Sequence, residues 1–343
     1  MQPIHRLLAA AGLALGLTAA FAAPAAAQTN LNMSVWIAQQ APFVQNAMLV
    51  WAKQAEEATA GRVKVRLLPK AVTTSPQHYD AVRDGLADVT FVIHGFTPGR
   101  FVLTKVAEMP FLGESAEATS VAYNRVYMGQ LAKANEHTGV KLLAVFTHGP
   151  GQLFMTSKPV GKVEDLAGMK FRTGGGVVND LAGALGVTSL MKPPSEVYEI
   201  LSSGVADGVF FARESILTFK LAPLIKHATL VPGGLYNTSF ALIMNEPKFN
   251  ALSPADQAAI VQVSGEGFAR LAGRSFEDSD QKGLVQLRDA KTSLATASPA
   301  FVEQLRKATQ PVVDAWAKEA AAKGVDGPAA LASLRAEAAK LAK

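Results

Sequence analysis

The segment that organises this chain runs from Glu164 to Phe211 and reads EDLAGMKFRTGGGVVNDLAGALGVTSLMKPPSEVYEILSSGVADGVFF. From Met169 to Thr173 apolar and basic side chains alternate, a period-two pattern that predicts a half-buried strand with Arg172 near its C-terminal end. In an open α/β sheet that end of a strand faces the ligand crevice. We therefore expect the guanidinium of Arg172 to point into a binding site.

Glycines and helix caps divide the rest of this stretch into short elements. Gly174 to Gly176 permit a sharp turn beneath the arginine, and Val177 to Leu185 is predicted to form a short helix. Ser195 can cap a second helix that ends at Gly204, and Ala206 to Phe211 is predicted to be the next strand. Strands that alternate with helices predict βαβ units, a parallel sheet and the α/β fold class.

The composition indicates a folded protein with two cores. The chain has 343 residues, of which 49% are hydrophobic and 18% are charged, and this length suits two lobes better than one. The net charge of +5 is mild and the basic residues are scattered, so no nucleic-acid-binding surface is predicted. The chain has no cysteine, which excludes disulfides and a lipidated N-terminus.

The alternation of strands and helices continues along the whole chain. Further strands are predicted over residues 31–37, 62–68, 89–93, 141–146, 228–231 and 236–244, and further helices over 42–58, 79–86, 116–137, 214–227 and 299–322. Ser253 and Pro254 begin a helix whose apolar positions continue toward Leu287, long enough to pass both lobes. From Lys323 onward we expect a surface helix with a frayed end.

The N-terminal residues have the pattern of a secretory signal peptide. His5 and Arg6 precede an apolar run from Leu7 to Ala23, and an Ala-x-Ala cleavage site follows at Ala25 to Ala27. We expect residues 1–27 to be removed and the mature chain to begin at Gln28 in the periplasm. A retained membrane anchor is the alternative, but the run is short and rich in alanine.

Two segments of the chain share one register. The segment YDAVRDGLADVTFV begins at Tyr79 and YEILSSGVADGVFF begins at Tyr198, with Gly, Ala-Asp and Phe at matching places. A repeated helix-to-strand unit would place Ile93 and Phe211 at the ends of equivalent strands, one in each lobe. The ligand site is then expected in the crevice between the lobes. The alternative is a chance match between two amphipathic helices whose phenylalanines belong to the core.

Three segments together resemble the substrate-binding proteins of tripartite ATP-independent periplasmic (TRAP) transporters, the DctP-like family. They are FTPGRFVLTKVAEMPF from Phe96, EDLAGMKFRT from Glu164 and SEVYEILSSGVADG from Ser195. The resemblance covers essentially the whole mature chain. It implies a two-lobed periplasmic binding protein, class II-like, with hinge strands and a long lobe-spanning helix. The expected ranges are 28–150 with 237–278 for lobe I, 151–236 with 279–322 for lobe II, and 323–343 for a helical tail.

The resemblance also implies a function. Such a protein closes on a small organic acid and delivers it to the small and large membrane subunits of a permease, as a monomer without cofactor or metal. In that family the arginine at the position of Arg172 grips the ligand carboxylate. A guanidinium is a planar fork that matches a carboxylate, which agrees with this role. From the residues alone, a structural salt bridge between Arg172 and a neighbouring acid such as Asp180 is the alternative.

Departures from the family pattern bear on the choice of acid. Members that bind highly polar acids resemble one another in a second arginine where this chain has Gln152 and Leu153. We expect one clamp, Arg172; apolar walls from Ile93, Leu153, Pro194 and Phe211; and polar handles from Trp36, His94, Gln152 and Asn237.

Such a site should favour an apolar or aromatic monocarboxylate, or a 2-oxo or hydroxy acid. A second carboxylate would lose its hydration against apolar walls without a partner, at a cost of several kcal/mol. A C4-dicarboxylate is the alternative, with a protonated His94 as the second cation.

An enzyme is the rival class, and the sequence does not favour it. No Gly-x-Ser-x-Gly motif occurs, and the six histidines show no metal-ligand spacing. The run Gly174 to Gly176 lacks the Lys-Ser/Thr of a P-loop and the spacing of a dinucleotide site. A periplasmic receptor that feeds a sensor instead of a permease remains the third possibility.

Overall fold

The computed structural model describes residues 28–343, and the predicted signal peptide lies outside this range. Two mixed sheets organise it, with strand orders β2-β1-β3-β10-β4 and β11-β9-β5-β8-β6-β7. Sheet A contains β1 (Thr29–Met33), β2 (Val63–Leu67), β3 (Val89–Ile93), β4 (Val140–Thr147) and β10 (Ser239–Asn245). Sheet B contains β5 (Gln152–Met155), β6 (Lys170–Thr173), β7 (Thr188–Met191), β8 (Gly208–Phe211), β9 (His227–Leu230) and β11 (Ser293–Thr296).

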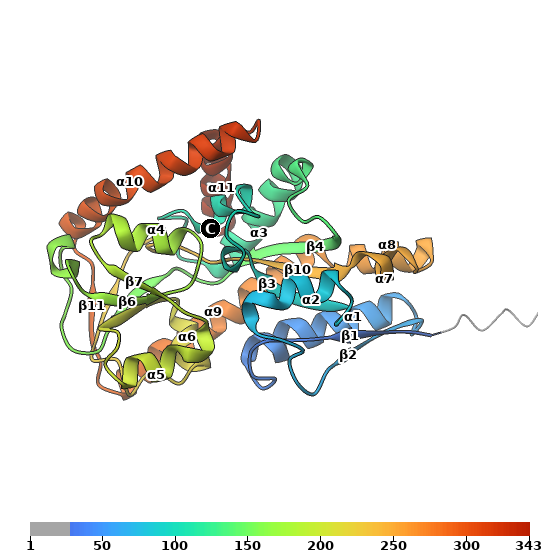
Figure 1. The fold of residues 1–343 in the computed structure, drawn as a ribbon, viewed down its shortest axis with the longest axis horizontal. Helices are drawn as coiled ribbons and strands as arrows, with labels where there is room; N and C mark the ends of the chain where they lie inside the picture. The colour runs from blue at the N-terminus through green and yellow to red at the C-terminus, as the bar shows by residue number, and fades with distance from the viewer. Residues whose placement is uncertain (1–27) are drawn as a thin grey trace, which may run out of the picture.

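Helices surround both sheets (Figure 1). They are α1 (Leu49–Ala58), α2 (His78–Arg83), α3 (Ala116–Val126), α4 (Val177–Ala184), α5 (Val197–Ser202), α6 (Arg213–Thr218), α7 (Glu246–Asn250), α8 (Pro254–Gln262), α9 (Gly265–Asp289), α10 (Pro299–Ala322) and α11 (Gly327–Leu341). A short 3-10 helix, η4 (Leu103–Glu108), and a π-helical turn, η1 (Val44–Met48), complete the elements used below. The predicted α/β class and two-lobed arrangement are confirmed; we call the part around sheet A lobe I and the part around sheet B lobe II.

The chain passes between the sheets three times, which explains why each sheet is mixed. It crosses from β4 to β5, returns from β9 to β10, and crosses again through α9 to β11. Strand β10 runs antiparallel to both of its neighbours in sheet A, and β5 does so in sheet B. The first two crossings are hydrogen-bonded to each other, because Gly151 donates to the carbonyl of Tyr236 and accepts from Leu235. The resemblance implied hinge strands at this place, but residues 148–151 and 231–238 are not in strands. The residue limits of the lobes remain a prediction.

Helix α9 joins the two cores. Its Phe268 and Phe276 are buried in the apolar cluster on sheet A, and Leu287 is buried in a cluster on sheet B. The predicted continuous helix from Ser253 is wrong at one point, because α8 and α9 are separate. Gly265 has a φ of +56°, in the left-handed region, so the backbone turns there.

Several other helix limits differ from the sequence prediction. Helix α2 ends at Arg83, because Gly85 adopts a φ of +80°, and Leu86 is exposed instead of buried. Helix α6 ends at Thr218 and not near His227. Ser195 caps nothing with its side chain, since a 3-10 turn leads into α5. Short helices end where glycines or turns provide hydrogen-bond partners for the last backbone groups of the helix. The spacing of apolar residues alone does not predict these ends.

The C-terminal helix α11 is part of the core and not a surface tail. Leu331 and Leu334 are buried, and α11 packs against α3. Arg335 of α11 donates to the carbonyl of Pro110, 2.8 Å away. The sequence did not predict this packing, because the small buried face of α11 consists of residues that are also common in exposed helices.

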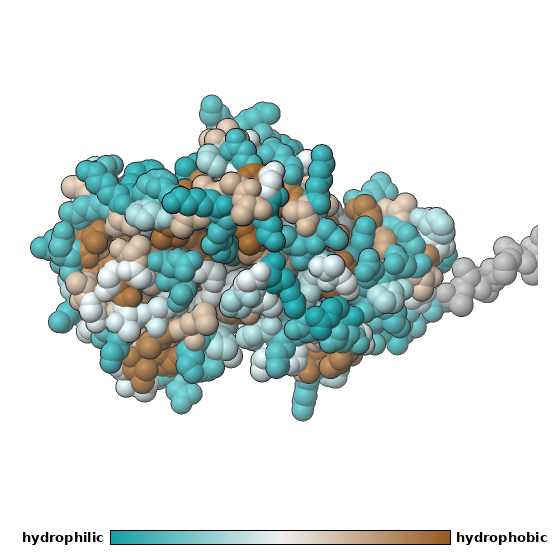
Figure 2. All heavy atoms as spheres, turned by 45° about the horizontal axis from the view of Figure 1, so that its top comes forward, coloured by the Kyte–Doolittle hydropathy of each residue, from teal (hydrophilic) through white to brown (hydrophobic). Residues whose placement is uncertain are grey.

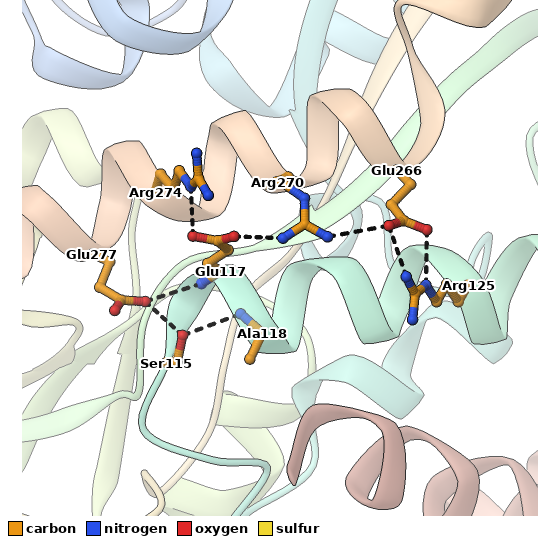
Figure 3. A network of polar contacts seen from close by, with 8 residues as sticks. All are labelled: Ser115, Glu117, Ala118, Arg125, Glu266, Arg270, Arg274 and Glu277. Atoms are coloured by element: carbon orange, nitrogen blue, oxygen red, sulfur yellow. Dashed lines mark hydrogen bonds and ion pairs between the residues drawn. The ribbon is translucent and has the colours of Figure 1, made fainter. Parts of the chain in front are cut away.

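A chain of charged side chains ties α9 to α3 (Figure 3). Arg270 contacts Glu117 at 2.6 Å and Glu266 at 3.2 Å, and Arg274 contacts Glu117 at 2.7 Å. Arg125 of α3 completes the chain at 2.8 Å from Glu266. Because several charges share partners, this network restrains the helix pair more than isolated surface pairs do.

The face of the molecule drawn in Figure 2 is mainly hydrophilic. Figure 2 shows polar residues over most of one face, with hydrophobic residues in small separate groups. Among residues 28–343, no helix combines the length and the apolar character needed to cross a bilayer.

Candidate ligand-binding site

A cavity lies between the two sheets, where the lobes face each other. Lobe I contributes Trp36, Ile37, Phe43, Phe91, Ile93, Phe96, Phe240 and Phe276, and lobe II contributes Arg172, Gly174, Gly175, Val178, Pro194, Phe211, Glu214, Ser215, Thr218 and Phe219. The crossing connections add His148, Tyr236 and Thr238. Five of the predicted site residues therefore meet here: Trp36, Ile93, Arg172, Pro194 and Phe211.

Arg172 is the cationic group of this cavity. It lies on β6 and is only 1% exposed. Its Nε and Nη2 donate to the carbonyl of Lys192 at 2.9 and 2.6 Å, and its guanidinium carbon lies 4.6 Å from the centre of the Phe211 ring. Within residues 28–343 it forms no ion pair, so the alternative of a structural salt bridge with Asp180 is wrong.

The charge of Arg172 is poorly compensated. Burial lowers its pKa to about 10, while Tyr236 and Glu196 act in the opposite direction. The guanidinium is therefore still charged near neutral pH. A buried charge without an opposite partner is costly, and a carboxylate arriving in the cavity would remove that cost.

Aromatic rings form the wall contributed by lobe I. Phe43 stacks on Phe276 with ring centres 4.6 Å apart and meets Phe91 edge-on at 4.8 Å. The indole N–H of Trp36 donates to the carbonyl of Phe91, so Trp36 presents only its ring to the cavity. Trp36 was predicted to be a polar contact for the ligand, but its indole N–H is already used in this hydrogen bond. Flat apolar walls of this kind suit a flat apolar ligand body.

His148 and Thr238 add a neutral polar pair. The ring Nδ1 of His148 faces the carbonyl of Gly149, which can only accept, so Nδ1 carries the hydrogen. Nε2 then accepts from the hydroxyl of Thr238 at 2.7 Å. Burial lowers the pKa of His148 to about 4, which keeps the ring uncharged at neutral pH.

Glu214, which carries a carboxyl group, also borders this cavity. One carboxyl oxygen accepts from the hydroxyl of Ser215 at 2.5 Å, and the other accepts from that of Thr218 at 3.0 Å. Burial raises its pKa, and the two hydroxyls act against that shift. The sequence prediction did not include Glu214. Its position could have indicated a site residue, because Glu214 is a polar residue that follows the end of strand β8 by three residues.

Three predicted site residues lie behind the cavity wall. Leu153 is fully buried in the apolar core. Gln152 accepts from the backbone N–H of Val231, and Asn237 donates to the carbonyl of His148. These side chains support the crossing connections, and none of them faces the cavity.

His94 also lies outside the cavity and does not supply a second cation. Its Nδ1 is 2.7 Å from the hydroxyl of Ser239, and its Nε2 is 2.8 Å from Nε2 of His137. Burial lowers the pKa of His94 far below its ordinary value, with His137 adding to the effect. His137, which contacts Tyr127 on its other side, has a pKa lowered by burial to about 3. Both rings are neutral at pH 7.

Sequence reasoning missed most of the aromatic wall. Phe43, Phe240 and Phe276 belong to a helix, a strand and another helix that are far apart in the chain. Each reads as an ordinary core residue within its own element, because an apolar side chain gives no local sign that it borders a cavity.

Comparison with known proteins identifies the family. The model of "Bacterial extracellular solute-binding protein, family 7" (DctP) matches residues 33–319. The chain belongs to the DctP family of TRAP solute-binding proteins. It is 31% identical over 325 residues to the outer membrane transporter protein TsaT of Comamonas testosteroni, covering 94% of this chain and 96% of that one.

Two solved TRAP proteins share this fold closely. One from Bordetella bronchiseptica, with bound (R)- and (S)-mandelate, is 47% identical with a TM-score of 0.89, covering 91% of this chain and 99% of that one. A marine metagenome protein with 3-hydroxybenzoate is 30% identical with a TM-score of 0.85, covering 92% and 100%. Proteins of this family bind small organic acids and work with membrane permease subunits; they are transport proteins and not enzymes.

Proposed function

We propose that this protein captures an aromatic monocarboxylate in the periplasm and delivers it to a TRAP permease. The observation that carries the proposal is Arg172, a buried cation without a carboxylate partner among the described residues, in a cavity walled by aromatic rings. The positive charge of Arg172 favours a ligand with one carboxylate, and the aromatic rings favour a ligand with a flat apolar body. The mandelate and 3-hydroxybenzoate bound to the two similar TRAP proteins support the same ligand class.

A compact dicarboxylate fits this cavity less well. Its second carboxylate would lie among phenylalanine rings or near Glu214, and neither offers a positive charge. His94, the alternative second cation, is neutral and lies outside. An unpaired buried carboxylate costs several kcal/mol, which selects against succinate and malate.

Calorimetry on ligand-stripped protein tests the proposal. Mandelate, benzoate and succinate are titrated into the wild type and Arg172→Ala. We expect the aromatic acids to bind the wild type, and Arg172→Ala to bind them at least thirty-fold more weakly, since removing one partner of a buried charge pair costs roughly 2–5 kcal/mol.

Arg306→Ala is the matched control, because Arg306 also lies over an aromatic ring, that of Phe111, but outside the cavity. It should bind like the wild type. Unchanged affinity in Arg172→Ala, or strong binding of succinate with none of the aromatic acids, would overturn the proposal.

A further inference from the structure

Within the described part of the chain, residues 28–343, Glu214 is the one acidic residue that borders the cavity. It lies in the first turn of α6, three residues after Phe211, and is 7% exposed. It thus shares with Arg172 a small space otherwise bordered mainly by aromatic rings. A carboxyl group in such surroundings has to find hydrogen-bond partners within the cavity.

The position of Glu214 is fixed from behind. Its backbone N–H donates to Oδ1 of Asp280 on α9, 2.6 Å away. Gly283 on α9 lies against the carbonyl of Arg213, where an added Cβ would come within 2.0 Å. Helix α6 therefore sits tightly on α9, and the carboxyl group of Glu214 has little freedom to leave the cavity.

The hydrogen-bonding capacity of Glu214 is only partly used. The hydroxyls of Ser215 and Thr218 each donate one hydrogen bond to it. An ionised carboxylate offers about four acceptor positions, and a protonated one keeps acceptor capacity beside its O–H donor, so acceptor capacity remains in either state. Within residues 28–343 no basic side chain forms an ion pair with Glu214.

The unused acceptor positions of Glu214 favour one kind of substituent on the ligand. A C–H group of the ligand leaves them unsatisfied, and a second carboxylate would be repelled. A ligand hydroxyl donates a hydrogen bond and satisfies one of them. We propose that Glu214 is a specificity-determining residue that accepts a hydrogen bond from a hydroxyl on the bound acid, so that hydroxylated aromatic acids bind in preference to their unsubstituted counterparts.

This inference rests on the proposed function and is tested with acids that differ by one hydroxyl. The pairs are mandelate with phenylacetate and 3-hydroxybenzoate with benzoate, measured by calorimetry on ligand-stripped full-length mature protein. The hydroxyl preference is the ratio of the two Kd values in a pair. We expect a ratio of about ten or more in at least one pair, since leaving a buried acceptor without its partner costs about that factor.

Substitutions at Glu214 then assign the preference. Glu214→Leu should lower the ratio to about one by weakening only the hydroxylated acid, while the unsubstituted acid binds at least as well. Glu214→Met, unbranched and of similar length, serves if the leucine variant does not fold. Glu136→Gln is the control, because Glu136 is an equally buried carboxyl group that accepts from the backbone of Val102 and Leu103 outside the cavity. Its ratio should equal that of the wild type.

The outcomes separate this inference from the proposed function. A wild-type ratio near one in both pairs, or a ratio that survives in both Glu214 variants, overturns the role of Glu214 while binding of all four acids still supports the carrier. Loss of the preference in Thr238→Val but not in the Glu214 variants would transfer the role to Thr238, a cavity residue whose hydroxyl oxygen keeps acceptor capacity while it donates to His148. Failure of every aromatic acid to bind the wild type would overturn the proposed function itself.

Discussion

The Oε2 atom of Glu108 accepts a hydrogen bond of 2.8 Å from the backbone N–H of Val177, and this bond connects the two lobes. Glu108 ends η4 in lobe I, whereas Val177 is the first residue of α4 in lobe II. The carboxylate thus caps a helix of the opposite lobe, where the helix dipole favours negative charge. Helix α4 begins five residues after Arg172, so this contact positions the turn that follows the ligand-binding strand.

Removing this cap should weaken ligand binding without changing selectivity. Glu108→Ala loses a helix cap worth about 0.5–2 kcal/mol, so we expect roughly tenfold weaker binding of every aromatic acid. Burial raises the pKa of Glu108 to about 7, and calorimetry at about pH 8 keeps the carboxylate ionised.

The matched control is Glu136→Ala, because Glu136 accepts backbone hydrogen bonds within lobe I only. It should lower the melting temperature and leave the affinity unchanged. Equal affinities of the wild type and Glu108→Ala for the aromatic acids would contradict the role of this contact in positioning the turn that follows the ligand-binding strand.

A methyl group at Gly175 should keep the lobes apart. An added Cβ would lie 2.1 Å from the carbonyl oxygen of Gly95 in the opposite lobe, far inside any real contact. Gly175 has no positive φ, so the substitution strains only the approach of the lobes. Overpacking costs about 1–3 kcal/mol, and we expect Gly175→Ala to bind aromatic acids at least tenfold more weakly.

Small-angle scattering provides a second measurement for the same variant. Adding the acid should shrink the wild type but not Gly175→Ala. Gly183→Ala on the exposed side of α4 is the control, because its Cβ would meet nothing within 4 Å. A normal ligand-induced contraction in Gly175→Ala would show that the glycine contact does not limit closure.

Lowering the pH should reduce the difference in the free energy of unfolding between the wild type and His137→Gln. Burial lowers the pKa of folded His137 from 6.5 to about 3, so the neutral ring stabilises the fold above pH 6.5 and this contribution is lost as the pH falls. Between about pH 7.5 and pH 5 the wild type should lose about 2 kcal/mol more than the variant. Denaturant unfolding at both pH values measures this difference. A difference that does not change with pH would mean that His137 is charged in the fold or does not titrate on unfolding.

The charged network between α3 and α9 should contribute a salt-dependent stability. Glu117 receives both Arg270 and Arg274, and its side chain is 23% exposed. Glu117→Gln should lower the free energy of unfolding by about 1 kcal/mol at low salt and by less at 1 M salt. Glu57→Gln, which breaks one exposed pair with Lys53, should cause no measurable change. Equal losses at both salt concentrations would contradict an electrostatic role.

The sequence located the part of the site that comes from one continuous stretch of lobe II. Arg172, Pro194 and Phe211 come from one continuous stretch whose turns and alternation are local signals. Elsewhere, Ile93 and Trp36 of lobe I were found. The predictions for His94 in lobe I, for Gln152 and Leu153 on β5 in lobe II, and for Asn237 in a crossing connection placed core and connection side chains in the cavity. Alternation tells which side chains share a face of a strand, and it does not tell whether that face meets a cavity or another layer of side chains.

Local patterns in the sequence were sufficient to predict the strand and the turn that carry the arginine. Period-two alternation put Arg172 at a strand end, and glycines after it set the turn. The groups around that arginine come from distant parts of the chain, so their arrangement follows from the three-dimensional packing. The ring of Phe276 and the carboxyl-bearing Glu214 border the same cavity, and the backbone of Gly95 meets Gly175 in the turn after the arginine. They meet because the chain crosses between the sheets three times. Contacts over such sequence separations depend on the packing of both lobes at once, which no local pattern encodes.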